Sequence, residues 1–243
     1  MLNRLVRSPH VRRIQKFVTA ESSLLFSIAL VSGLILSFLR IADWVEDDEL
    51  EAFDHTILMW FRDPTNIDQV VGPEWLHEMV RDVTALGSFV MLGLIVAGVV
   101  IYLLMLRLKS EAVLVLISVL GGTLISTVLK MTYDRPRPDL VSMSHQFTAS
   151  FPSGHAMLSA VTFLTLGALL SKLAPTRALR IFSFSSAIFL TLIVGVSRIY
   201  MGVHFPSDVL AGWCLGAAWA LLCSAVAVLL QRFGKVMPTP VQN

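Results

Sequence analysis

Residues 83–129 read VTALGSFVMLGLIVAGVVIYLLMLRLKSEAVLVLISVLGGTLISTVL, and this stretch decides the fold class. It consists of two charge-free apolar runs, Val83–Leu106 and Ala112–Leu129, separated only by the short charged segment 107–111. Each run is long enough to cross the hydrocarbon of a bilayer, which takes about 20 residues of helix. Backbone groups in hydrocarbon must bond within their own segment, so both runs are predicted to be helices.

The rest of the chain repeats this pattern. Four further runs contain no charged residue: Ser22–Leu39, Ala156–Ser171, Ile181–Ser197 and Val209–Gln231. Only 15% of the 243 residues are charged, whereas about 25% is usual for a soluble domain. A soluble helical bundle would need charged positions recurring along each helix, and these runs have none. We therefore predict an all-α integral membrane protein, with one domain of six transmembrane helices over residues 22–231.

The distribution of Lys and Arg predicts the orientation. If the N-terminus is cytoplasmic, the inner segments carry 12 of the 19 basic residues, five of them within the first 16 positions. Segments 1–21 and 232–243 are therefore expected in the cytoplasm. No small-residue cleavage site follows Leu39, so the first run is expected to remain as an anchor. In a bacterium this membrane would be the inner membrane. The net charge of only +2 gives no support to nucleic-acid binding.

One long connection, residues 43–82, lies on the predicted outer face. It contains 12 acidic residues and two arginines. Phe53, Ile57, Trp60 and Phe61 fall at helical spacing, which is typical of a helix lying in the membrane interface. A solvated loop with one amphipathic turn fits the same pattern, and both interpretations stay open. The segment is also a candidate lid over a site on this face.

Three polar clusters flank the predicted helices. The first, KMTYDRPRP at residues 130–138, follows the third run. The second, PSGH at 152–155, precedes the fourth, and the third, SRIYMGVHFPSD at 197–208, joins the fifth run to the sixth. Taken singly, the cations could be snorkelling residues, the serine a simple helix cap and the histidines polar boundary residues. All three clusters lie on one predicted membrane face, however, and together they indicate a phosphate site.

The residue types suit phosphoryl chemistry. A phosphoryl group carries charge on its equatorial oxygens, so catalysis mainly needs positioning and positive charge. The cations Lys130, Arg137 and Arg198 can supply that charge, the arginines as bidentate forks. Backbone N–H groups at Ser153-Gly154-His155 would form an anion seat at the start of a helix, and Gly154 would let the backbone approach closely.

Two histidines fit the roles of nucleophile and acid. A histidine can attack phosphorus through one ring nitrogen while a carboxylate holds the other. Asp208, four residues after His204, is the natural holder. A histidine also suits proton donation to a leaving oxygen, because its ordinary pKa is about 6.5.

With these spacings the sequence resembles the type 2 phosphatidic acid phosphatase (PAP2) superfamily, whose motifs are KxxxxxxRP, PSGH and SRxxxxxHxxxD. The resemblance implies that His204 forms a phosphohistidine, Asp208 orients it and His155 protonates the leaving group. It also implies that the phosphate is held by Lys130, Arg137, Ser153, Gly154 and Arg198, and that no metal or other cofactor is needed. Arg135 has the wrong spacing from Lys130, so Arg137 is assigned to the first motif.

The family implies a membrane lipid phosphate as the substrate. Undecaprenyl diphosphate is the first expectation, followed by phosphatidylglycerophosphate and phosphatidate. The soluble vanadium haloperoxidases of the same superfamily are disfavoured by the six spans. A lipid phosphotransferase using the same phosphohistidine stays an alternative. A non-catalytic lipid transporter or scaffold fits less well, because the nucleophile, acid and cations are all present. The sequence does not predict an oligomeric state.

Overall fold

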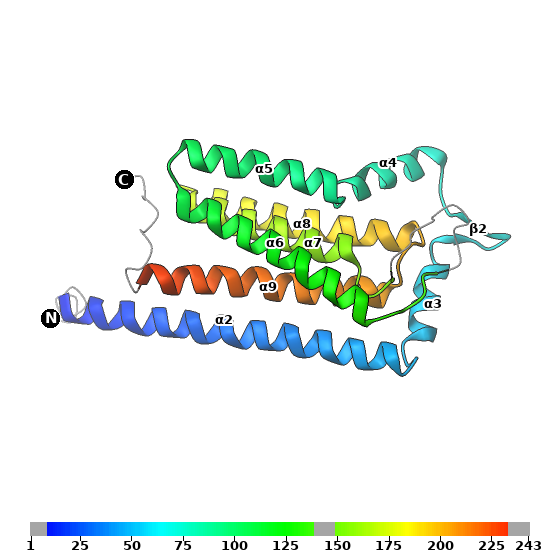
Figure 1. The fold of residues 1–243 in the computed structure, drawn as a ribbon, viewed down its shortest axis with the longest axis horizontal. Helices are drawn as coiled ribbons and strands as arrows, with labels where there is room; N and C mark the ends of the chain where they lie inside the picture. Colours follow the sequence, from blue (N-terminus) through cyan, green and yellow to red (C-terminus); the bar gives the residue numbers. More distant parts are fainter. Residues whose placement is uncertain (1–8, 139–148, 233–243) are drawn as a thin grey trace.

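The structure is a computed structural model that describes residues 9–138 and 149–232, and within them it is built of helices and one short hairpin (Figure 1). Five of these helices are long and apolar enough to cross a membrane. They are α2 (Pro9–Glu46), α6 (Lys109–Thr132), α7 (Gly154–Leu173), α8 (Arg177–Tyr200) and α9 (Pro206–Arg232). These five helices confirm five of the predicted spans.

The predicted sixth span corresponds to two helices rather than to one straight helix. Helices α4 (Glu74–Ala85) and α5 (Phe89–Met105) meet at an angle of 50°, and only as a pair are they long and apolar enough to be a candidate span. The sequence predicts a single run from Val83 to Leu106, but α5 starts afresh after Ser88, whose side chain accepts a hydrogen bond from the Met91 amide. A Cβ at Gly87 would lie 2.4 Å from Val194, so only glycine fits at this elbow. The elbow thus brings the chain directly against α8.

Helix α7 is the centre of the bundle. It packs against α6, α8 and α9, and 61% of its spanning window is buried, against 28% or less in the other four unbroken spans. Small residues allow the close approach, as is common between membrane helices. A Cβ on Gly212 would lie 2.8 Å from the Ser153 carbonyl oxygen, and one on Gly216 would lie 2.5 Å from that of Met157. Helix α9 therefore lies directly on the first turns of α7.

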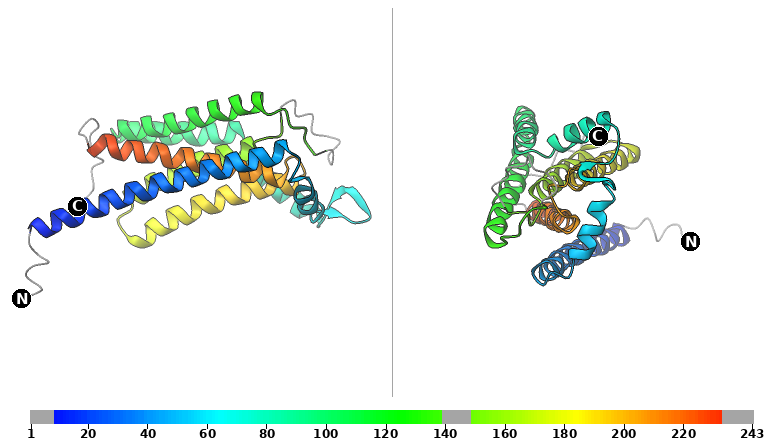
Figure 2. Two further views of the ribbon diagram at one scale, coloured as in Figure 1. Left: turned by 90° about the horizontal axis from the view of Figure 1, so that it is seen from below. Right: turned by 90° about the vertical axis from the view of Figure 1, so that its right-hand side faces the viewer.

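The segment predicted to face outward, residues 43–82, forms a small cap at one end of the bundle, named the outer cap after that prediction. It contains α3 (Glu51–Met59), a hairpin of β1 (Arg62–Asp63) with β2 (Asn66–Val70), and most of α4. The predicted helix is present, and it crosses the end of the bundle (Figure 2). Its buried residues are Asp54 and Leu58, and the apolar residues Phe53 and Trp60, noted for their spacing, are 42% and 69% exposed. The hairpin was not anticipated from the sequence.

Both ends of the described chain lie at the opposite end of the bundle. Helix α2 begins there and α9 ends there, away from α3 and the hairpin (Figures 1 and 2). This agrees with an even number of crossings. Residues 1–8 and 233–243 of the predicted cytoplasmic segments lie outside the described residues, and the cytoplasmic orientation stays a prediction.

The glycine contact between α9 and α7 gives a direct test. Changing Gly216 to Ala should destabilise the protein by about 1–3 kcal/mol, because the new methyl group overlaps backbone atoms that cannot rotate away. Changing Gly93 to Ala on α5 is the matched control, since nothing lies within 4 Å of a Cβ there. Thermal melting in detergent should show a lower Tm for Gly216→Ala alone. Equal melting of the two variants would contradict the tight α7–α9 contact.

Candidate active site

The centre of the site is a buried histidine–carboxylate pair. His204 precedes α9, and Asp208 lies in the first turn of that helix. The two side chains are 1% and 0% exposed, and His204 Nδ1 lies 3.3 Å from Asp208 Oδ2. The same carboxylate oxygen accepts a hydrogen bond from the Phe205 amide at 2.9 Å. The start of α9 therefore fixes both partners, because each is tied to the same turn.

The contacts of the ring determine where its proton lies. Arg137 Nη1 is 3.2 Å from His204 Nε2 and donates to the Val203 carbonyl oxygen at 2.9 Å. A guanidinium can only donate, so Nε2 accepts and the ring proton is on Nδ1, facing Asp208. Burial lowers the pKa of His204 to about 4, despite the opposing hydrogen bond and charge of Asp208. At neutral pH the ring is neutral, with a lone pair on Nε2.

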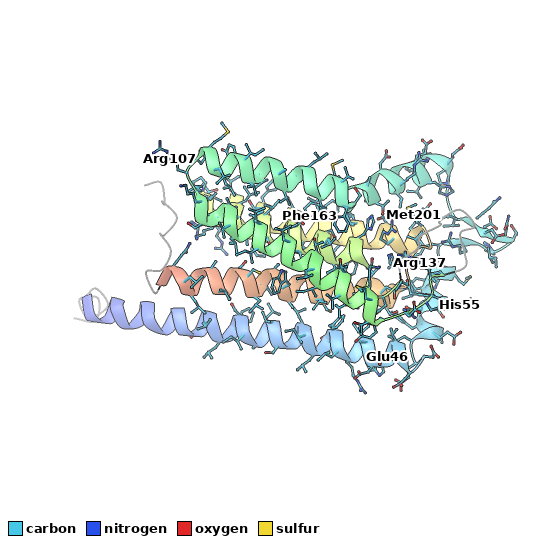
Figure 3. All side chains as sticks on the ribbon, viewed as in Figure 1. Glu46, His55, Arg107, Arg137, Phe163 and Met201 are labelled. Atoms are coloured by element: carbon cyan, nitrogen blue, oxygen red, sulfur yellow. The ribbon has the colours of Figure 1, made fainter. Side chains whose placement is uncertain are left out.

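A cavity of about 790 Å³ lies beside Nε2. Five of the eight residues predicted for the site line it: Lys130, Arg137, Gly154, His155 and His204. Figure 3 shows Arg137 at the end of the bundle near the outer cap. Lys130 Nζ donates to the Ala149 carbonyl oxygen at 2.7 Å, and Arg137 Nη2 approaches the same oxygen at 3.5 Å. The two cations therefore converge on one point at the wall of the cavity.

The other three predicted residues are buried around this cavity. Arg198 is 3% exposed and donates from Nη1 to Thr84 on α4 at 3.3 Å. Its Nε and Nη2 atoms have no hydrogen-bond partner within the described part of the chain. These two atoms form the parallel donor pair that an arginine offers to a phosphate. Helix α8 and the elbow of the broken span thus hold Arg198 in place.

Ser153 has a more structural role than the sequence indicates. Its side chain caps α7 by accepting from the Ala156 amide, and its own amide donates to the Asp208 carbonyl oxygen at 3.0 Å. The sequence predicts an anion seat made of the Ser153, Gly154 and His155 amides. The Ser153 amide is not available for it, because it already donates to Asp208. The first-turn amides of Gly154 and His155 are left for a ligand, because the first amides of a helix lack intrahelical partners. A side chain at position 154 would meet Lys130 Cε at 3.4 Å.

Sequence reasoning missed a set of polar side chains that surround Asp208 and its neighbour Asp54. Arg135, set aside because of its spacing, donates from Nη1 to Asp208 Oδ1 at 2.7 Å and from Nη2 to Asp54 Oδ2 at 2.8 Å. Ser150 donates to Asp208 Oδ2, and Ser207 donates to Asp54 through both its amide and its hydroxyl. All four residues lie at the same end of the bundle.

Two of these four residues left a signal in the sequence. The pair Arg135-Pro136 duplicates the Arg137-Pro138 of the first cluster. Asp54 is a carboxylate on the same helical face as Leu58, which is an unusual position for an isolated charge. Ser150 left no such signal. Among the described residues, no group of three or more His, Cys, Asp or Glu side chains could hold a metal ion.

Comparison with known proteins identifies a matching family and several similar proteins. Residues 111–232 match the model of the PAP2 superfamily. The chain is 31% identical over 206 residues to phosphatidylglycerophosphatase B of Bacillus subtilis, covering 83% of this chain and 96% of the relative. It is 38% identical over 68 residues to undecaprenyl-diphosphatase of Sulfolobus acidocaldarius, covering 28% and 29% of the two chains.

A solved structure has the same architecture. The crystal structure of a transmembrane PAP2 type phosphatidylglycerolphosphate phosphatase from Bacillus subtilis superposes with a TM-score of 0.75 at 27% identity. The match covers 84% of this chain and 98% of that one. The similarity therefore extends over the bundle as a whole and is wider than the three motif clusters.

The buried neutral His204 predicts a pH-dependent stability. An unfolded histidine takes up a proton near pH 6.5, whereas the folded ring does so only at about pH 4. Stability from this residue is therefore present above pH 6.5 and lost as the pH falls toward 4. Between pH 7.5 and pH 5, Tm should fall further for the wild type than for His204→Gln, whose amide does not titrate. Parallel Tm curves for the two proteins would show that the ring is not held neutral.

Proposed function

Because the chain belongs to the PAP2 superfamily, we propose that it removes the phosphate of a membrane lipid through a phosphohistidine on His204. The family match and the similar proteins show that the chain is a multi-pass membrane protein and a lipid phosphatase of the PAP2 type. One observation supports the phosphohistidine mechanism most directly. His204 faces Asp208 with Nδ1 and the cation-lined cavity with Nε2.

The first half-reaction transfers the phosphoryl group to the enzyme. The Nε2 lone pair attacks phosphorus, and the bond from phosphorus to the lipid oxygen breaks. Lys130, Arg137 and Arg198 stabilise the charge on the phosphoryl oxygens. His155, which becomes protonated once the negatively charged phosphate binds beside it, donates a proton to the departing lipid oxygen. The Nδ1 proton stays on the ring and is held by Asp208, which stabilises the positive charge that the phosphorylated ring acquires.

The second half-reaction returns the enzyme to its starting state. His155, now neutral, removes a proton from a water molecule as that water attacks phosphorus. The bond from phosphorus to Nε2 breaks, and inorganic phosphate leaves with the water oxygen. His204 regains its neutral form and His155 its proton. The cycle needs no metal ion, because the three cations supply the positive charge that a metal would otherwise provide.

The walls of the cavity favour a lipid as the substrate. Phe89 on α5, Met131 on α6 and Leu158 on α7 line the same cavity as the cations. Phe89 is 65% exposed and Met131 is 83% exposed, on helices that would face lipid. A head group can therefore bind the cations while its acyl chains stay beside these apolar residues. Phosphatidylglycerophosphate is the first substrate in this proposal. The phosphatase of Bacillus subtilis that matches 83% of this chain is named for it. Undecaprenyl diphosphate, ranked first from the sequence, comes second.

The test is phosphate release by the detergent-purified protein in EDTA across phosphatidylglycerophosphate, phosphatidate and undecaprenyl diphosphate. We expect release that survives EDTA and falls to background in His204→Ala, because the nucleophile is lost. His155→Ala should slow release from the two phosphate monoesters by about 10²–10³-fold and affect the diphosphate less, because its leaving group is less basic. His55→Ala, an exposed histidine on α3, is the matched control and should keep full activity.

Two outcomes would change the assignment. Normal turnover by His204→Ala would overturn the phosphohistidine mechanism. A phosphorylated acceptor lipid in place of free phosphate would identify a phosphotransferase that shares the first half-reaction.

We also propose that the site lies on the outer face of the membrane, with both termini in the cytoplasm. The basic residues of the sequence support this orientation. Asp68→Cys in the exposed hairpin should react with a membrane-impermeant maleimide in intact cells, since the hairpin is at the same end as the site. Labelling only after the cells are lysed would reverse the orientation.

A further inference from the structure

We infer that Asp54 and Arg135 are positioning residues for the reaction: they hold the carboxylate of Asp208 in place and balance the charge that acts on His204. This inference builds on the proposed function, since it assigns the outer cap a part in orienting the nucleophile. Neither residue lines the cavity, and the polar atoms of both are already bonded within the protein, so neither is expected to touch the substrate.

The geometry places Arg135 between two carboxylates. Its Nη1 lies 2.7 Å from Asp208 Oδ1, and its Nη2 lies 2.8 Å from Asp54 Oδ2. Both carboxylates are 0% exposed. The guanidinium also lies over the ring of Phe205, 4.2 Å from its centroid. With both ends of the fork bound and one face stacked, Arg135 has a single available position.

Asp54 anchors this arrangement from the outer cap. Its Oδ1 accepts from the Ser207 amide at 2.8 Å, and its Oδ2 accepts from the Ser207 hydroxyl and from Arg135. Ser207 is the residue immediately before Asp208. Asp54 therefore holds the start of α9 both through the backbone and through Arg135.

The bond from Arg135 fixes how the Asp208 carboxylate is turned. Oδ1 is bound by Arg135, and this leaves Oδ2 facing His204 Nδ1 at 3.3 Å. Without Arg135, Oδ1 would lose this bond, and the carboxylate would be held only at Oδ2, by the Phe205 amide and Ser150. The carboxylate could then tilt about Oδ2, and the ring that it holds would shift relative to the cavity. A displacement of about 1 Å at a reacting group can reduce the rate about 10²-fold.

The three side chains also form a charge balance. Two carboxylates and one guanidinium give a net charge of −1 beside His204. Burial would lower the pKa of Arg135, but Asp208 and Asp54 together raise it, so the guanidinium stays charged. Neutralising Arg135 would leave −2, and neutralising Asp54 would leave zero. These two changes should therefore move the protonation of His204 in opposite directions.

Other charged or titratable groups around His204 remain the same in such variants. They come from α6, α7, α8, α9 and the segment before residue 138, and they are Lys130, His155, Arg198, Asp208 and Arg137. Any difference between variants at positions 54 and 135 is therefore due to those two positions.

The experiment follows the ionisation of His204 in two ways. The first is the ring resonance of His204 in ¹⁵N-histidine-labelled protein in detergent, assigned by its loss in His204→Gln. The second is the acid limb of kcat/KM for phosphate release. Arg135→Gln should move both to higher pH, and Asp54→Asn should move both to lower pH, each by about 0.5–1 unit. In both variants kcat should fall about 10-fold with little change in KM, because neither residue contacts the substrate.

Two further variants separate charge from folding. Asp54→Asn combined with Arg135→Gln restores a net charge of −1, so its titration should return toward that of the wild type. Arg135→Lys keeps the charge but cannot bridge two carboxylates, so kcat should fall while the titration stays unchanged. Asp68→Asn and Arg81→Gln make the same chemical changes at exposed positions of the outer cap and should have no effect. Tm measured for every variant identifies any that is only unfolded.

The results distinguish this inference from the proposed function. Shifts in the same direction for Asp54→Asn and Arg135→Gln, or no shift in either, would overturn the positioning role even if His204 proves essential. A shift in Arg135→Lys equal to that in Arg135→Gln would also overturn it. Opposite shifts of the ring resonance would support it, including in a protein that releases no phosphate, where only the proposed function would fail.

Discussion

Hydrocarbon excludes charge, and in this chain the charged groups of the site are therefore confined to the ends of membrane helices. Lys130 lies in the last turn of α6 and Arg198 in the last turn of α8. His155 lies in the first turn of α7 and Asp208 in the first turn of α9. The site forms where these four ends meet, so its geometry depends on how closely the helices pack. The glycine contacts between α7 and α9 thus help to set the positions of the polar groups of the site.

The positively charged residues of the site fall into two kinds, according to the groups to which they are bonded. Arg135 is bonded to two buried carboxylates, so its donors are already used and it orders the protein around it. Lys130 instead donates to a backbone carbonyl oxygen, which is neutral, and Arg198 donates to a threonine hydroxyl. A phosphate can compete with such neutral acceptors far more readily than with a carboxylate, because its charge strengthens each hydrogen bond. The difference explains how cations at one end of the bundle can serve separate purposes.

The sequence predicts the spans and the eight site residues because both leave local signals. Charge-free runs mark the helices, and fixed spacings mark clusters such as 197–208. The remaining features depend on contacts between distant positions. Asp54 lies 81 residues from Arg135 and 153 from Ser207, and no periodicity connects them. The elbow before Ser88 is similarly decided by the side chain of Val194 on another helix. These features are set by tertiary contacts, which local sequence patterns do not reveal.

The bridge made by Arg135 also restricts how the family can diverge. A carboxylate at position 54 without a cation at 135 would leave two buried negative charges side by side, and the reverse loss would leave a guanidinium with one vacant donor end. Either change alone is costly, whereas losing both together keeps the local charge constant. Positions 54 and 135 should therefore covary across homologues, although one belongs to the outer cap and the other adjoins a motif. A covariation signal between them would give a fixed point for aligning the cap between relatives.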